Sequence, residues 1–230
     1  MERGLYIAAT GMVAEMVRQD QIANDLANAS TPGYKADRSR QSSFGDLLLS
    51  NTVTGQPIGP LGMGARIDRI VTDMTPAPLR QTGEPLDFAI QGEGWFGVRT
   101  AQGVRYTRNG QFALSAQGTL IDAMGNQVLG RGGAPIRARR DGTVDPTQLG
   151  VFNLANPRKI GDSYVTGAAA GQATGTVQAG ALEGSNADPA HSMVDMIASF
   201  RAYEASQRVV RTIDETLQKA SNVVGGMPGS

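Results

Sequence analysis

The chain has 230 residues, enough for one domain or two small modules. Basic and acidic residues balance at 21 each, so net charge gives no reason to expect nucleic acid as the main partner. Cysteine is absent and His191 is the only histidine, which excludes disulfides, thiolate chemistry and multi-histidine metal centres. Aromatic residues make up 5% of the chain against 30 glycines, so we expect a thin core that depends partly on other chains for stability.

The first segment, residues 1–29, predicts an amphipathic helix over residues 2–29. Its apolar residues recur at an alternating spacing of four and three, as in a heptad seam. Pro32 and Gly33 follow the helix and end it, because proline forces the preceding residue out of helical geometry. The residues expected to contact other helices are Leu5, Met12, Met16, Ile22 and Leu26.

Residues 30–77 are rich in glycine, proline, serine and threonine and predict an irregular or extended linker. One or two helical turns are expected there, at Phe44–Leu49. Residues 78–183 instead carry short alternating apolar runs separated by glycines, which predicts a mainly antiparallel all-β domain. Asn109-Gly110 is a strong signal for a two-residue hairpin, and Gly167–Gly180 is expected to be a loop or weak strands.

The last segment, residues 184–230, predicts a second long helix, with Asp188 as the N-cap and Pro189 at the first helical position. Its apolar seam repeats the three–four spacing and is interrupted by Gln207 and Asp214, as Gln19 interrupts the first helix. These polar residues either fix the helix register or simply face solvent. The seam residues expected at an interface are Met193, Met196, Ile197, Phe200, Tyr203, Val210, Ile213 and Leu217.

The predicted fold class is therefore α+β: N- and C-terminal helices paired as a coiled-coil-like module, with an inserted β domain. A helix of about 28 residues is roughly 42 Å long, and a sheet domain of about 100 residues has a radius of gyration near 13 Å. The two seams are thus expected to cover each other or to be covered by neighbouring copies.

Catalytic motifs are weak throughout the chain. Gly92–Gly97 matches G-x-G-x-x-G, but the following residues predict a strand where a dinucleotide site needs a helix, so a turn is favoured. Ser163 lacks the surroundings of a hydrolase serine. The acids Glu84, Asp87 and Glu93 could form a carboxylate pair for glycoside cleavage, but acids beside turns are usually solvated. We expect no enzyme activity, no cofactor and no metal site.

Three blocks of sequence resemble the bacterial flagellar rod, hook and hook-associated axial proteins. The blocks cover nearly the whole chain in the order of the family, and proximal rod proteins are the most similar members, followed by distal rod proteins. They are LYIAATGM at 5–12 with QIANDLANASTPGYK at 21–35; TGEPLDFAIQGEGWF at 82–96 with YTRNGQF at 106–112; and LEGSN at 182–186 with MVDMI at 193–197 and RAYE at 201–204.

The resemblance implies a structural subunit of the flagellar basal-body rod, polymerising helically through its terminal helices into the drive shaft between motor and hook. The implied partners are copies of itself, other rod and hook axial proteins, and the flagellar type III export apparatus. No nucleic-acid partner and no membrane insertion are expected, and export without a cleaved signal peptide is implied. The alternative is a secreted β-domain that binds carbohydrate or peptidoglycan through Trp95, Tyr106 and nearby carboxylates.

Overall fold

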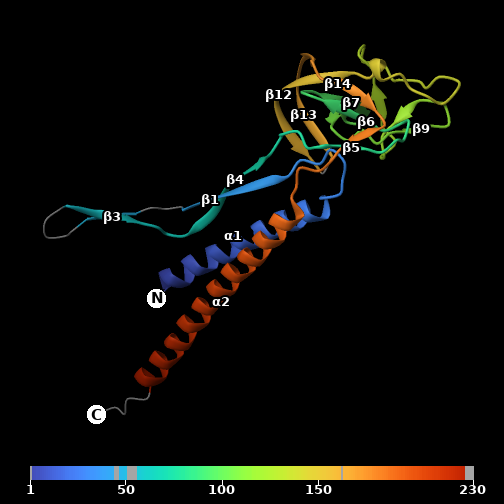
Figure 1. Ribbon diagram of the computed structural model, residues 1–230. Coiled ribbons are helices and arrows are strands. Elements are labelled where there is room, and N and C mark those ends of the chain that lie inside the picture. Colours follow the sequence, from blue (N-terminus) through green and yellow to red (C-terminus); the bar gives the residue numbers. More distant parts are fainter. Residues whose placement is uncertain (1, 44–46, 51–55, 162, 226–230) are drawn as a thin grey trace, which may run out of the picture. The chain divides into compact units, whose positions relative to one another are not determined.

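The computed structural model describes residues 2–43, 47–50, 56–161 and 163–225 (Figure 1). The chain forms two compact units. The first comprises Met1–Asn24, Asp37–Val71 and Ala190–Ser230, and the second comprises Asp25–Ala36 and Thr72–Pro189. The fold is α+β, with a helix towards each end of the chain and a β-rich part between them.

Both predicted helices are present. Helix α1 spans Glu2–Ala27 and α2 spans Pro189–Gly225. After α1 the chain turns through a hydrogen bond from the Thr31 amide to the Asn28 carbonyl, and Gly33 has a φ of 67°, which favours glycine. Among the described residues, no helix is long and apolar enough to cross a membrane.

The first unit also contains most of four strands, where the sequence predicted an irregular linker over residues 30–77. Strand β1 (Asp37–Ser43) pairs with β4 (Ala65–Thr72), and β2 (Leu47–Ser50) pairs antiparallel with β3 (Pro57–Leu61). The sequence predicted an irregular or extended region and did not identify these strands, because β1 is built from polar residues, which show none of the apolar alternation used to recognise strands. The helical turn expected at Phe44–Leu49 lies partly outside the described residues, and its described part belongs to β2.

The second unit is the expected antiparallel β domain. Seven strands form one sheet in the order β12-β13-β8-β7-β11-β10-β9, and an additional pairing of β12 with β7 closes a small barrel. Strands β7, β12 and β13 are labelled in Figure 1. The remaining strands pair as β14 with β6 and β15 with β5. The strands are β5 (Leu79–Gln81), β6 (Phe88–Gln91), β7 (Trp95–Thr100), β8 (Gly103–Thr107), β9 (Ala113–Leu114), β10 (Leu120–Ile121), β11 (Gln127–Leu129), β12 (Val151–Ile160), β13 (Tyr164–Gln172), β14 (Thr176–Ala179) and β15 (Ala181–Glu183).

The core of the second unit is small but closely packed. Phe96 and Phe112 meet edge to face, with ring centroids 5.3 Å apart and an interplanar angle of 77°. A second, smaller cluster contains Trp95 and Tyr106 together with Leu154 and Val165. The main cluster consists of Phe88, Ile90, Phe96, Val98, Phe112, Leu120, Val128, Ile136, Val144, Leu149 and Val151.

One local prediction in this unit was wrong, and a second, which left a loop or weak strands open, is decided in favour of strands. The expected hairpin at Asn109-Gly110 is absent, because β8 pairs with β7 and β13, and the following strand β9 pairs with β10. Gly110 instead accepts a hydrogen bond from the Phe88 amide, and a Cβ at this position would lie only 1.6 Å from the Phe88 carbonyl oxygen. The residues Gly167–Gly180, expected to be a loop or weak strands, contribute most of β13 and all of β14.

Candidate assembly surface

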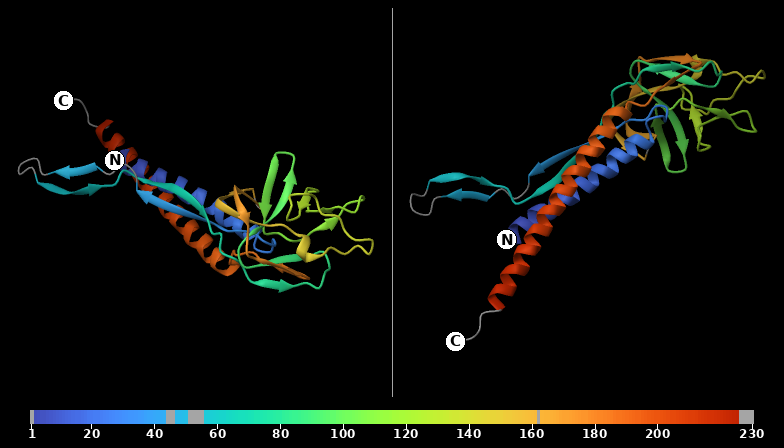
Figure 2. Two further views of the ribbon diagram at one scale, coloured as in Figure 1. Left: turned by 90° about the horizontal axis from the view of Figure 1, so that it is seen from above. Right: turned by 60° about the horizontal axis from the view of Figure 1, so that its bottom comes forward.

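Helices α1 and α2 run antiparallel and side by side within the first unit (Figures 1 and 2). The Ser199 hydroxyl donates a 2.6 Å hydrogen bond to Glu15 Oε2, and Arg18 Nη2 lies 3.8 Å from Asp195 Oδ1. A Cβ placed on Gly4 would lie 3.3 Å from Ile213 Cδ1. The described contacts between the helices thus involve small and polar residues as well as apolar ones.

On α1, each residue that contacts α2 lies one position before a residue of the predicted seam. The contact residues are Gly4, Glu15 and Arg18, together with Gly11, whose added Cβ would lie 3.7 Å from Ser206 Oγ. The predicted seam instead ran through the next position in each turn, for example Met16. Of the predicted positions on α1, Met16 is left exposed, whereas Leu5, Met12 and Leu26 are half-buried and Ile22 is buried.

The predicted interface residues differ in exposure within the chain. Five are exposed, with 41–55% of their surface accessible: Met16, Met193, Ile197, Phe200 and Leu217. Ile22 is buried, with 6% accessible. The remaining seven are half-buried: Leu5, Met12, Leu26, Met196, Tyr203, Val210 and Ile213.

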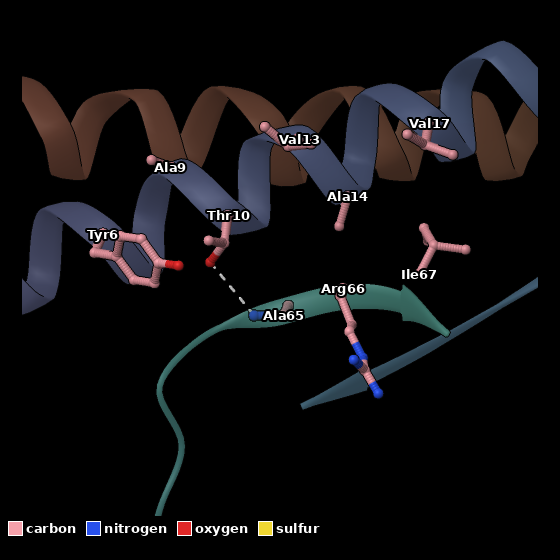
Figure 3. Close-up of a pocket in the computed structure, with 9 residues that line it drawn as sticks. All are labelled: Tyr6, Ala9, Thr10, Val13, Ala14, Val17, Ala65, Arg66 and Ile67. Atoms are coloured by element: carbon pink, nitrogen blue, oxygen red, sulfur yellow. Dashed lines mark hydrogen bonds between the residues drawn. The ribbon is translucent and has the colours of Figure 1, made fainter. Parts of the chain in front are cut away.

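A groove between α1 and β4 contains apolar residues that the sequence analysis missed (Figure 3). It has a volume of about 430 Å³ and is lined on the helix side by Tyr6, Val13 and Val17, which are all exposed. Thr10 and Ala65 also line the groove, and Thr10 Oγ1 accepts a 3.4 Å hydrogen bond from the Ala65 amide. The spacing of Tyr6, Val13 and Val17 is helical, so a search for a second apolar stripe on α1 would have found them.

The polar interruptions of the seam do not make the cross-helix contacts. Gln207 and Asp214 are exposed and Gln19 is half-buried, while Glu15 and Arg18 make the described polar contacts with α2. His191, at the start of α2, is exposed, and its Nε2 lies 3.5 Å from Asp195 Oδ2.

The residues considered for enzymatic or ligand-binding roles lie in a strand connection, take part in a hydrogen bond with a neighbouring strand, or are single acids that are exposed or buried. Gly92 and Gly94 lie in the connection from β6 to β7, with φ values of 99° and 125°, and a strand follows them, not a helix. The Ser163 carbonyl accepts a 2.7 Å hydrogen bond from the Thr107 hydroxyl. Glu84 and Glu93 are exposed, whereas Asp87 is buried. In the part of the chain that the structure describes, no cluster of three or more His, Cys, Asp or Glu residues could hold a metal ion.

The two aromatic residues of the carbohydrate-binding alternative belong to the core. Trp95 and Tyr106 each have 7% of their surface accessible. The guanidinium of Arg108 lies 5.4 Å from the centroid of the Trp95 ring, and the Tyr106 and Phe152 ring centroids are 5.7 Å apart. A ring covered in this way offers no stacking face to a sugar.

Comparison with known proteins identifies the family. The flagella basal body rod protein family matches residues 5–35, the flagellar hook protein FlgE/F/G D1 domain matches 89–162, and the flagellar basal body rod FlgEFG C-terminal family matches 178–223. FlgG of Agrobacterium fabrum is 33% identical, over 93% of this chain and 96% of its own. The chain belongs to the flagellar basal-body rod protein family.

Other rod proteins match over almost their full length. FlgG of Bacillus subtilis is 30% identical, over 97% of this chain and 99% of the relative. FlgF of Salmonella typhimurium is 29% identical over the same shares of the two chains. This rod-family chain is therefore a structural protein of the flagellar basal body and not an enzyme, and relatives named FlgG and FlgF match it to a similar degree.

Proposed function

We propose that this rod-family chain polymerises helically through its terminal helices, within the drive shaft between motor and hook. The observation that carries the proposal is the set of large apolar side chains left exposed on α2: Met193, Ile197, Phe200 and Leu217. A soluble monomer gains nothing from such a row, whereas a neighbouring subunit could bury it.

The energetic argument favours neighbours as the cover. Burying one large apolar side chain contributes roughly 1.5–3 kcal/mol, so a few exposed residues on each helix could supply a substantial part of a subunit contact. Methionine suits such a surface because its flexible thioether adapts to different neighbours. Met16 on α1 and Met193 on α2 are both half-exposed, with 52% and 51% accessible.

In the proposed assembly the two helices of each subunit pair as a coiled-coil-like module. The residues Gly4, Gly11, Glu15 and Arg18 follow the alternating spacing that such a pair needs. Their small or polar side chains let the helices meet while the larger side chains remain available to other subunits. The groove beside Tyr6 and Val13 extends the proposed assembly surface on α1.

We assign the chain first to the proximal rod and second to the distal rod, with copies of itself and other rod and hook axial proteins as neighbours. The flagellar type III export apparatus is the proposed route out of the cell, without a cleaved signal peptide. These assignments rest on the family resemblance of the sequence blocks at both ends and in the β domain.

Purified basal bodies test the proposal. An epitope-tagged full-length chain, expressed in place of the untagged one, should appear between the motor ring and the hook in a few stoichiometric copies. Labelling on the motor side of the rod would support the proximal assignment, and labelling next to the hook would support the distal one. Absence of the tagged protein from basal bodies of motile cells would overturn the rod role.

A further inference from the structure

The chain passes between its two units four times, after Asn24, Ala36, Val71 and Pro189. On the second unit's side of these crossings, residues far apart in sequence form one hydrogen-bonded group, which we call the junction cluster. It consists of Asp25, Gly33, Tyr34, Lys35, Ala36, Asp73, Arg108, Glu183 and Asn186.

Glu183 is the centre of the junction cluster and has only 1% of its surface accessible. Its Oε1 accepts hydrogen bonds of 2.6 Å from Lys35 Nζ and 3.0 Å from the Ala77 amide. Its Oε2 accepts one of 2.8 Å from Arg108 Nη1, and its backbone carbonyl accepts one of 2.9 Å from the Gly33 amide. One residue at the end of β15 thus connects the chain that follows α1 with two parts of the β domain.

The two cations are held by further acceptors. Arg108 Nη2 donates to the Gly92 carbonyl at 2.8 Å, and Lys35 Nζ donates to the Thr75 carbonyl at 2.7 Å. Burial lowers the pKa of Lys35 below its ordinary value of 10.5, and the Glu183 carboxylate opposes that shift. Removing the carboxylate charge should be strongly destabilising, because both cations would remain buried without a compensating negative charge.

Asn186 connects the chain segments at three of the four crossings through side-chain hydrogen bonds. Its Oδ1 accepts a 2.7 Å hydrogen bond from the Ala36 amide, and its Nδ2 donates one of 2.7 Å to the Asp73 carbonyl. The Asp73 amide in turn donates to the Ala36 carbonyl at 2.8 Å. These residues lie next to the crossings after Ala36, Val71 and Pro189.

The remaining crossing, after Asn24, is connected through Tyr34. The Tyr34 hydroxyl donates a 2.8 Å hydrogen bond to Asp25 Oδ1, and its ring is fully buried beneath Lys159 Nζ, 4.0 Å from the centroid. Gly33 fits closely beside it, because a Cβ there would lie 2.3 Å from the Arg108 carbonyl carbon. Every crossing therefore has a residue within the junction cluster.

We propose that the junction cluster couples the four crossings, so that all of them are ordered or released together and none acts as an independent linker. Separate linkers would each fluctuate on their own, whereas cross-linked ones open as a cooperative unit. A twisting force that reaches the second unit through one crossing is then shared by the others. That mechanical consequence rests on the proposed rod function, but the coupling itself is a property of the single chain.

Amide hydrogen exchange on the full-length chain tests the coupling. Glu183→Gln keeps the shape of the side chain and removes its charge, and Asn186→Ala removes the amide that joins three crossings. In Glu183→Gln we expect exchange roughly tenfold faster at Ala36 and Asp73, whose amides donate to Asn186 Oδ1 and to the Ala36 carbonyl. In Asn186→Ala the same acceleration is expected at Gly33, which is bonded to Glu183. Amides of the core strands β7 and β11 should be unchanged.

The matched controls are Glu93→Gln and Asn153→Ala, which change exposed side chains of the same unit. Neither should accelerate exchange in the junction cluster. Acceleration confined to the direct partners of the substituted side chain would overturn the proposal. If Glu183→Gln unfolds the whole unit, exchange at Gly33 in Asn186→Ala decides the question. Neither result depends on rod assembly, so failure here is distinct from failure of the proposed function.

Discussion

The Ser199 hydroxyl donates a 2.6 Å hydrogen bond to Glu15 Oε2, and both residues are buried where α1 meets α2. A buried carboxylate needs such a donor because desolvation without compensation is costly. The pair also links one residue of each helix, which fixes how far one helix is shifted along the other. It therefore favours one register of the two helices over neighbouring ones.

Replacing Ser199 by alanine should destabilise the helical unit by about 1–3 kcal/mol, because Glu15 loses its hydroxyl donor while remaining buried. The measurement is urea unfolding followed by the helical circular dichroism signal. Thr212→Ala is the control, since that residue is exposed and its hydroxyl donates to the Arg208 carbonyl of its own helix. Equal midpoints for the two variants would contradict the role assigned to the Glu15–Ser199 pair.

Gly110 is expected to be intolerant of any side chain. An alanine Cβ would lie 1.6 Å from the Phe88 carbonyl oxygen and 3.2 Å from the Phe96 ring, so backbone of the β domain would have to move. Gly110→Ala should lower the free energy of unfolding of this domain by more than about 2 kcal/mol. Gly132→Ala, where an added Cβ meets nothing within 4 Å, should change it little. Thermal unfolding monitored by Trp95 fluorescence compares the two, and similar midpoints would refute the steric argument.

The pKa of Tyr164 should lie well above the ordinary tyrosine value of 10.0. Burial, together with the hydrogen bond that its hydroxyl donates to Asp122 at 2.5 Å, raises its pKa from 10.0 to about 12. Because the folded-state value is raised, the resulting stability is fully present below pH 10.0 and is lost as the pH rises through about 12. Tyrosinate absorbance during an alkaline titration measures this. Tyr164→Phe should lower the amplitude of the absorbance change near pH 12 by the contribution of one tyrosine, and an unchanged amplitude there would be inconsistent with the assignment.

The sequence predicted the helices and the β domain because their signals are local. Proline at Pro32 and Pro189 marks helix boundaries through backbone geometry, and alternating residues such as Phe96 and Val98 mark a strand with one buried face. The polar strand β1 carries no such signal. Its pairing with β4 depends on a contact between distant segments, which a local pattern does not encode.

The interface residues were predicted from spacing alone, and spacing leaves the facing direction open. A four–three repeat fits the line through Gly11 and Glu15 as well as the line through Met12 and Met16. The methionines were chosen as large apolar residues, but the described contacts between the helices involve glycine and polar residues of α1. The junction cluster was missed for a different reason: Lys35 and Glu183 are 148 residues apart, and neither has a local pattern that indicates a buried ion pair.

The central claim is that the exposed apolar side chains of α2 are the surface that other subunits cover. The most direct measurement is incorporation of Phe200→Asp and Leu217→Asp variants into purified basal bodies, quantified against wild type. We expect incorporation to be lost while Trp95 fluorescence of the free chain stays that of a folded β domain. The control Gln218→Asp, an exposed polar position on the same helix, should incorporate normally. Wild-type incorporation of both apolar variants, in cells that swim normally, would contradict the account.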